Sequence, residues 1–280
     1  MVKIISDSTC DLSKELVEKY NIDILPLHIH LGDEEYEDGK TITPEEIFAW
    51  SDKNKATPKT SVASIAEVTD LFQKYEGEIV CFSISEEMST TANVMRLAVQ
   101  ELERENEIFI INSKNLSTGL GLLVVEASIM AMQGKCAKEI VTEIEQMIPK
   151  VRSSFVVDTL TYLHRGGRCS GVAALAGSAL QLHPKIVVQN GKMEADKKYR
   201  GKINKVVMNY VKELEEELKN AKQDRVFITH SGCEKEVVEE VREYLKQLNV
   251  FEEIIETRAG SVISSHCGPA TLGVLYIMKS

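Results

Sequence analysis

Apolar runs rich in Val and Ile alternate with amphipathic stretches along this 280-residue chain, and this alternation is the feature that most limits its fold. Residues 2–6 (VKIIS), 78–85 (EIVCFSIS) and 107–113 (EIFIINS) have the pattern of buried strands, and each precedes a helical pattern. Regular strand–helix alternation is typical of α/β folds with a parallel sheet. We therefore predict an α/β fold whose N-terminal part has a largely parallel sheet flanked by helices.

Two helices of the N-terminal part have clear start signals. Thr43 can cap a helix whose first residue is Pro44, and Glu46 completes a capping box. Ser64 and Glu67 repeat this spacing at the next helix. The acidic stretch between the early strands and the first of these helices, DEEYEDG, is interpreted as a solvated turn.

The second half of the chain has a different pattern of predicted elements, which indicates a second domain. Asn190-Gly191 separates two strand-like runs and favours a tight hairpin, because both residues tolerate positive φ. Residues 205–220 have the pattern of one long charged helix. We predict an N-terminal α/β domain over residues 1–153 and a C-terminal α/β domain with a mixed sheet over residues 154–280, with a ligand between them.

The formal net charge of −10 opposes general attraction to nucleic acid or to an anionic membrane. No apolar run approaches the ~18 residues of a membrane span, and the N-terminus becomes polar too early for a secretory signal. The six cysteines are scattered singly, without C-x-x-C pairs, and are expected to be free thiols. We expect a cytoplasmic protein in which any anionic ligand is held by a local site.

Four polar segments follow apparent strands, and ligands of open α/β sheets bind beyond the carboxyl ends of strands. In two of these segments there are more hydroxyls than helix capping needs, which leaves Thr60 and Ser61 free in one of them. Hydroxyls and backbone N–H groups at a helix start can hold a carboxylate or phosphate without a full positive charge. The segments are 6–11 (SDSTCD), 57–64 (TPKTSVAS), 85–91 (SEEMSTT) and 162–171 (YLHRGGRCSG).

Histidines offer further candidates. His266, in SSHCGPATLG near the C-terminus, could add a third donor to such a site, although a lone histidine is more often structural. His28 and His30 are two residues apart, but no third ligand can be named, so we interpret them as ordinary strand residues and predict no metal site. No Asp–His–Ser pattern can be identified, and no catalytic residue is assigned.

The segment that holds Arg165 and Arg168 is the most unusual local feature. The two arginines bracket a pair of glycines, and guanidinium groups suit phosphate and carboxylate alike. This segment could contact phosphate or a partner protein, or it could be a glycine turn with solvated arginines. Residues 171–182 (GVAALAGSALQL) follow as a predicted helix, whose small side chains suit close packing or the wall of a narrow apolar channel.

Taken together, these segments resemble the DegV family over nearly the full length of the chain. Each is weak alone, but the five occur in the order of the family and at compatible spacings. They are SDSTCDL (6–12), PKTSVAS (58–64), SISEEMSTTANVMRLA (83–98), DTLTYLHRGGRCSG (158–171) and GSVISSHCGPATLGVLY (260–276).

The resemblance implies a two-domain α/β protein that binds a long-chain fatty acid such as palmitate, with its tail buried between the domains. It places Thr60 and Ser89 at the carboxylate, with His266 near the same group. We add Ser61, the neighbour of Thr60, to this set. Some members present the acid to a separate fatty acid kinase. The resemblance therefore implies a binding protein without a cofactor, active in lipid transport or as an acyl-presenting subunit, with transient membrane contact.

The sequence departs from the family pattern while keeping its hydroxyl positions. The departures leave the preferred ligand open, and they are Val62, Ala63, Met88, Thr90 and Ala270. The main alternative is a phosphotransferase or hydrolase that holds a small phosphorylated substrate at Arg165 and Arg168, although the chain has no P-loop motif. A third alternative is an interaction protein whose polar loops only cap helices.

Overall fold

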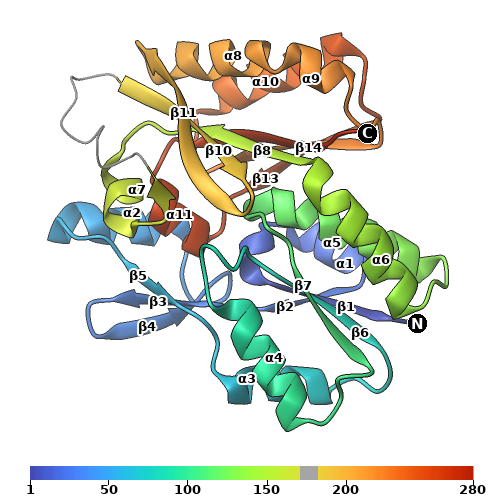
Figure 1. The fold of residues 1–280 in the computed structure, drawn as a ribbon. Helices are drawn as coiled ribbons and strands as arrows, with labels where there is room; N and C mark the ends of the chain where they lie inside the picture. The colour runs from blue at the N-terminus through green and yellow to red at the C-terminus, as the bar shows by residue number, and fades with distance from the viewer. Residues whose placement is uncertain (171–181, 280) are drawn as a thin grey trace.

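The structure, a computed structural model, describes residues 1–170 and 182–279. Its N-terminal lobe is built on a four-stranded sheet in the order β2-β1-β6-β7, in which every neighbouring pair is parallel (Figure 1). Such a sheet needs helices on both faces. The strands are β1 (Lys3–Asp7), β2 (Ile22–Leu25), β6 (Ile79–Ser83) and β7 (Ile108–Asn112), and the helices of this part are η1 (Ser8–Cys10), α1 (Lys14–Lys19), α3 (Ile65–Gln73), α4 (Thr91–Glu101), α5 (Ser117–Met132), α6 (Ala137–Met147) and η2 (Ile148–Lys150).

A small antiparallel sheet, in the order β4-β3-β5, was not foreseen from the sequence. Its strands are β3 (His28–Leu31), β4 (Glu34–Glu37) and β5 (Lys59–Ser61), and α2 (Pro44–Asn54) packs beside it. The prediction that DEEYEDG is a solvated turn is therefore wrong, because β4 lies within it. β4 is an exposed edge strand, and the charged side chains that protect such an edge conceal its strand pattern.

The C-terminal lobe is built on a seven-stranded mixed sheet in the order β13-β12-β14-β8-β10-β11-β9. Its outer face is covered by α8 and α10, as Figure 1 shows. The strands are β8 (Val151–Val156), β9 (Cys169–Ser170), β10 (Leu182–Gln189), β11 (Lys192–Arg200), β12 (Arg225–His230), β13 (Glu253–Arg258) and β14 (Leu272–Ile277), and the helices are α7 (Thr161–Gly166), α8 (Ile203–Glu213), α9 (Glu215–Lys219), α10 (Lys235–Leu248) and α11 (Ser261–Cys267). The predicted α/β class, with a parallel first sheet and a mixed second sheet, is confirmed.

The hairpin β10–β11 forms as predicted. Its turn residues have positive φ, 50° at Asn190 and 84° at Gly191. Gly191 is also required by space, because a Cβ there would lie 2.5 Å from Ser85 Oγ, which donates a hydrogen bond to the Gly191 carbonyl at 2.7 Å. The turn of the C-terminal lobe thus docks on the loop that follows β6 in the N-terminal lobe.

One other prediction needs adjustment. The long helix predicted over residues 205–220 is two helices, α8 and α9, and a short-range hydrogen bond from Leu214 N to the Val211 carbonyl tightens the backbone between them. Residue 153 lies inside β8, and the domain boundary between residues 153 and 154 stays a prediction. Independent folding of the two domains stays a prediction, and the helix predicted over 171–182 lies almost entirely outside the described residues.

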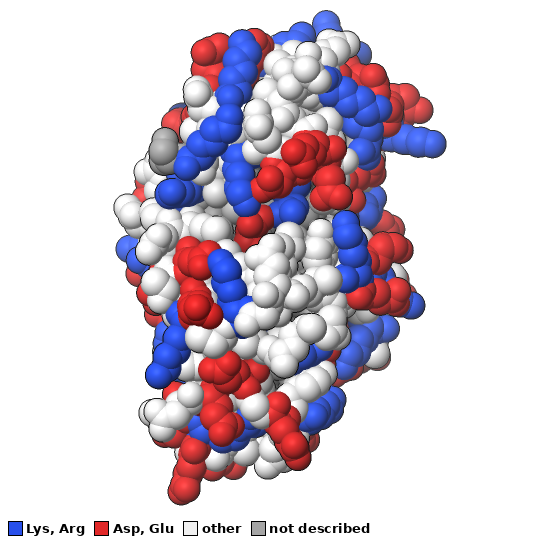
Figure 2. All heavy atoms as spheres, turned by 90° about the vertical axis from the view of Figure 1, so that its right-hand side faces the viewer, with Lys and Arg blue, Asp and Glu red and all other residues white. Residues whose placement is uncertain are grey.

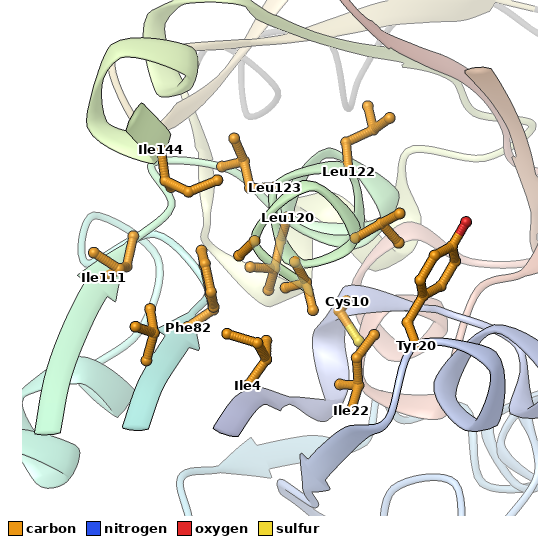
Figure 3. Packing of buried hydrophobic residues seen from close by; sticks show 14 of the residues in the cluster. Ile4, Cys10, Tyr20, Ile22, Phe82, Ile111, Leu120, Leu122, Leu123 and Ile144 are labelled. Carbon is orange, nitrogen blue, oxygen red and sulfur yellow. The ribbon is translucent and has the colours of Figure 1, made fainter. Parts of the chain in front are cut away.

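Helix α5 lies between the two sheets and belongs to the core of both. It contacts β1 and β6 of the first sheet and β8, β12 and β14 of the large sheet. Figure 3 shows Leu120 of α5 on the side of Ile4 and Phe82 of the first sheet, and Leu123 beside Ile144 of α6. Almost all of its side chains are buried, as expected for a helix that is apolar on every side. The layers are therefore α8/α10, large sheet, α5/α6, first sheet and α3/α4.

A buried ion pair reinforces this junction. Glu126 of α5 contacts the guanidinium of Arg225 on β12, and its other oxygen lies 2.7 Å from Lys222 Nζ. Glu126 and Arg225 are 5% and 9% exposed. Removing one member of such a pair leaves an uncompensated buried charge, so the pair fixes α5 against the large sheet.

The surface shows no general basic field on the face seen in Figure 2, where Lys and Arg side chains lie beside Asp and Glu around an uncharged area. Among the described residues, no helix is long and apolar enough to cross a membrane. All six cysteines lie in the described part of the chain, and none of them forms a disulfide bond there.

Candidate functional site

A cavity of about 470 Å³ lies between the two lobes, at the carboxyl ends of the parallel strands. Its volume is within the range typical of small-molecule sites. The walls come from both lobes and from α11, which lies beside α7 and α2 in Figure 1. The lining residues are Thr9, Leu27, Thr60, Ser61, Val62, Ile84, Glu86, Met88, Ser89, Thr90, Leu116, Arg168, Met193, Val262, Ile263, His266 and Cys267.

The structure brings together five of the six residues singled out from the sequence. Thr60 and Ser61 reach the cavity from β5, Ser89 from the loop after β6, and His266 from α11. Thr60 Oγ1 and His266 Nε2 are within hydrogen-bonding distance, at 2.9 Å. Ser61 also lines the cavity, although its hydroxyl lies 2.8 Å from His30 Nε2. Residues far apart in the sequence therefore line the same cavity.

His266 is closely enclosed. A Cβ on Gly166 would lie 2.5 Å from His266 Nδ1, so a glycine is needed for the ring to fit. This Nδ1 atom is buried and has no hydrogen-bond partner in the described part of the chain. Burial, followed by the positive charge of Arg168, lowers the pKa of His266 to about 4. The ring is therefore neutral at pH 7.

The low pKa of His266 predicts a pH dependence of stability. Because the folded state disfavours protonation, the contribution of His266 is fully present above its ordinary pKa of 6.5 and is lost as the pH falls towards 4. We compare the free energy of unfolding of the wild type with that of His266→Gln. The wild type should lose about 1–2 kcal/mol relative to the variant when the pH falls from 7.5 to 5. Urea titrations of both proteins at both pH values measure this difference. The pH dependence that comes from buried carboxylates cancels in the comparison, because both proteins contain the same carboxylates. An equal difference at both pH values would contradict the prediction.

The loop that carries Ser89 is fixed by a buried carboxylate. Asp7 Oδ2 accepts a hydrogen bond from Ile84 N at 2.7 Å, and Asp7 Oδ1 accepts from Thr9 N and its hydroxyl. Burial raises the pKa of Asp7 to about 6, and these hydrogen bonds oppose the rise. The Ser89 hydroxyl lies 2.8 Å from Thr91 Oγ1 and accepts weakly from Thr91 N. Ser89 thus steadies the start of α4 while facing the cavity.

The Gly-Arg segment, which holds Arg165, Gly166, Gly167 and Arg168, begins inside a helix. Arg165 lies in the last turn of α7, which ends at Gly166, and Gly167 continues with φ 66°. Arg165 does not line the cavity. Its guanidinium instead points to the Lys55 carbonyl, 3.4 Å away. Arg168 does line the cavity, where it is the one lysine or arginine among the described lining residues.

The apolar part of the cavity was not foreseen from the sequence. It includes Met193 of β11 and Ile263 of α11. A second cavity of about 30 Å³ is lined partly by residues of β12 and β14 and shares Leu116, Ile263 and Cys267 with the first. These three side chains form the wall between the two. Pocket walls and ordinary cores use the same residue types, and the sequence contains no signal that separates them.

Metal ligation finds no support in the residues that the structure describes, where no cluster of three metal-binding side chains occurs. His28 lies between two glutamates, 2.9 Å from Glu35 and 3.0 Å from Glu67, and it ties β3 to β4 and α3. His30 is the histidine that contacts Ser61. Both are strand residues, as predicted.

Comparison with known proteins agrees with this architecture. The profile of the DegV family, described as uncharacterised, matches residues 1–279. A DegV domain-containing protein of Clostridium acetobutylicum is 31% identical over 285 residues, covering 99% of each chain. Solved structures superpose closely. A fatty acid-binding DegV protein of Thermus thermophilus has a TM-score of 0.91 at 27% identity, over 99% of both chains.

A stearic acid-binding protein of Eubacterium ventriosum has a TM-score of 0.85 at 29% identity, over 100% of this chain and 99% of its own. The family match spans both sheets and every segment that forms the cavity. The resemblance seen in the five sequence segments is thereby confirmed over the whole chain. The chain belongs to the DegV family.

Proposed function

We propose that this protein binds a long-chain fatty acid, with the tail in the cavity between the lobes and the carboxylate at its polar end. The observation that supports the proposal is that Thr60, Ser89 and His266 line one cavity whose remaining lining is mainly apolar. The stearic acid-binding relative and the fatty acid-binding Thermus protein support it.

The energetics assign different tasks to the two ends. Burying a sixteen-carbon tail at ~0.8 kcal/mol per CH₂ gives roughly 12 kcal/mol before the costs of association. A hydrogen bond to a charged group contributes only about 1.5–3 kcal/mol. The tail therefore sets the affinity, and the hydroxyls orient the acid and keep its carboxylate from being buried without partners.

The neutral state of His266 gives it a defined part in this site. With its proton on Nε2, the ring donates to Thr60 Oγ1 across the 2.9 Å contact. The hydroxyl proton of Thr60 is then free to point at the carboxylate. His266 thereby orients Thr60 as a donor without bringing a second charge into the site.

We further propose that the protein carries the acid, palmitate being a suitable length, rather than transforming it. Arg168 supplies positive charge where a separate kinase would phosphorylate the carboxylate, and Arg165, on the outside of α7, suits contact with that partner. Lipid transport, the absence of a cofactor, transient membrane contact and a cytoplasmic location stay predictions. Extraction of the purified protein followed by mass spectrometry tests the ligand: a C14–C18 acid supports the proposal, and no acid together with turnover of a phosphorylated compound contradicts it.

Replacing Ser89 with alanine tests the head-group assignment. The variant should hold the acid at least about tenfold more weakly, because the carboxylate loses one charge-assisted hydrogen bond. Exchange of a labelled acid into delipidated protein measures the change. Ser64→Ala is the matched control, since Ser64 caps α3 and does not line the cavity. Equal retention by Ser89→Ala and the wild type would contradict the role.

A further inference from the structure

Helix α11 carries His266 near its C-terminal end, and two carboxylates from the N-terminal lobe hold its other end. Asp38 Oδ1 accepts hydrogen bonds from the first two N–H groups of the helix, at 2.7 and 3.3 Å. Asp11 Oδ1 accepts from the N–H of Gly260, the N-cap residue, at 2.8 Å. The start of this seven-residue helix therefore depends on side chains more than two hundred residues earlier in the chain.

Burying the carboxylates of Asp11 and Asp38 in their charged form costs free energy. Asp38 and Asp11 are 3% and 5% exposed, and burial raises the pKa of both, against the lowering effect of their hydrogen bonds. Asp11 and Ser117 are also both left-handed, at φ 51° and 52°, and the Ser117 hydroxyl donates to Asp11 Oδ2 at 2.5 Å. Strained non-glycine residues persist where the surroundings hold them, often at functional sites.

At the C-terminal end of α11, the His266 side chain is closely surrounded. His266 Nε2 lies 2.9 Å from Thr60 Oγ1, and the ring packs so closely against Gly166 that a Cβ there would lie 2.5 Å from Nδ1. The same helix also contributes Val262, Ile263 and Cys267 to the cavity wall. A small shift of α11 would separate His266 from Thr60 or press the ring against α7.

We infer that Asp11 and Asp38 are positioning residues for ligand binding, which set the place of His266 by fixing the opposite end of α11. The consequence for affinity rests on the proposed fatty acid function. The consequence for His266 itself does not, because it follows from the hydrogen bonds alone.

Asp38 offers the sharper test. In Asp38→Asn an amide oxygen can still accept from the first turn of α11, whereas Asp38→Ala removes the acceptor. The matched control is Ser13→Ala, which removes the side-chain cap of α1, where Ser13 Oγ accepts from Leu16 N at 3.4 Å. The control loses a helix cap of the same kind at a helix that contributes nothing to the cavity.

The first measurement is the pKa of His266, followed by NMR of protein with labelled histidine and without ligand. The wild-type value of about 4 should rise towards 6.5 in Asp38→Ala, because the displaced ring gains solvent. Asp38→Asn and Ser13→Ala should stay near the wild-type value. If Asp38→Ala does not fold, Asp38→Ser, with an acceptor that reaches less far, takes its place.

The second measurement is the affinity for palmitate of delipidated protein. Asp38→Ala should bind about tenfold more weakly, the loss expected for one misplaced hydrogen bond to the carboxylate, and Asp38→Asn should recover most of it. An unchanged His266 pKa in a folded Asp38→Ala protein would overturn the inference. A wild type that binds no fatty acid would instead contradict the proposed function, and the NMR result would still decide the role of Asp38.

Discussion

A protein with tryptophan in place of Ile263 is expected to lose long-chain fatty acids while still binding an eight-carbon acid. Ile263 lies in the wall between the main cavity and the small cavity behind it. A larger side chain there should reduce the space that is left for a long tail. Excluding about five methylenes costs roughly 4 kcal/mol, or close to a thousandfold in affinity for stearate. Octanoate, anchored at the polar end, should be affected little.

Competition binding on delipidated protein measures both affinities. Ile129→Trp is the matched control, because Ile129 is a partly buried residue of α5 that lines neither cavity. Thermal unfolding should accompany each assay, since overpacking alone costs about 1–3 kcal/mol of stability. Undiminished stearate binding by folded Ile263→Trp would show that the tail does not run towards this wall.

Replacing Gly166 with alanine should weaken fatty acid binding although the helix itself favours the change. Alanine stabilises a helical position by roughly 0.5–1 kcal/mol relative to glycine. Here, however, the new Cβ would lie 2.5 Å from His266 Nδ1, so the ring must leave Thr60. We expect a loss of affinity of about tenfold or more, with the melting temperature close to that of the wild type.

A double-mutant cycle makes this prediction specific. In a His266→Ala background, Gly166→Ala should have no further effect, because the ring that it displaces is gone. The neighbouring change Gly167→Asn is the control, since Gly167 has φ 66°, which asparagine tolerates, and open space around it. The same loss of affinity from Gly166→Ala with and without His266 would refute the mechanism.

The main architecture could be read from the sequence because the information for it is local. Strand–helix alternation, capping boxes and the Asn190-Gly191 turn each act within a few residues, and the structure contains all of them. The failures have a common origin in tertiary context. β4 is a strand because β3 lies beside it, not because its charged residues favour one.

The candidate site was predictable only in its polar half. Hydroxyls in excess of capping needs identified Thr60 and Ser61 as candidates, the family resemblance added Ser89, and all three line the cavity with His266. The apolar wall could not be found, because Ile263 and Leu116 look like core residues in any sequence. Asp38 was also missed, since its role depends on a helix that starts far away in the chain.

The two glycines of the Gly-Arg segment are required for different reasons, one conformational and one steric. Gly167 is required by its backbone angle, while Gly166 is required by the imidazole that lies against it. The absence of a side chain at Gly166 lets α7 lie close against His266 of α11.

Helix α5 has a consequence for how an acyl chain gets in and out. Its side chains complete the interior on both sides, and Glu126 ties it to Arg225 of the opposite sheet. A hinge motion that separates the lobes would expose the apolar side chains of α5 to water and leave a buried charge without its partner. We therefore expect the ligand to enter and leave through small local movements at the mouth of the cavity, while the two sheets keep their positions relative to each other.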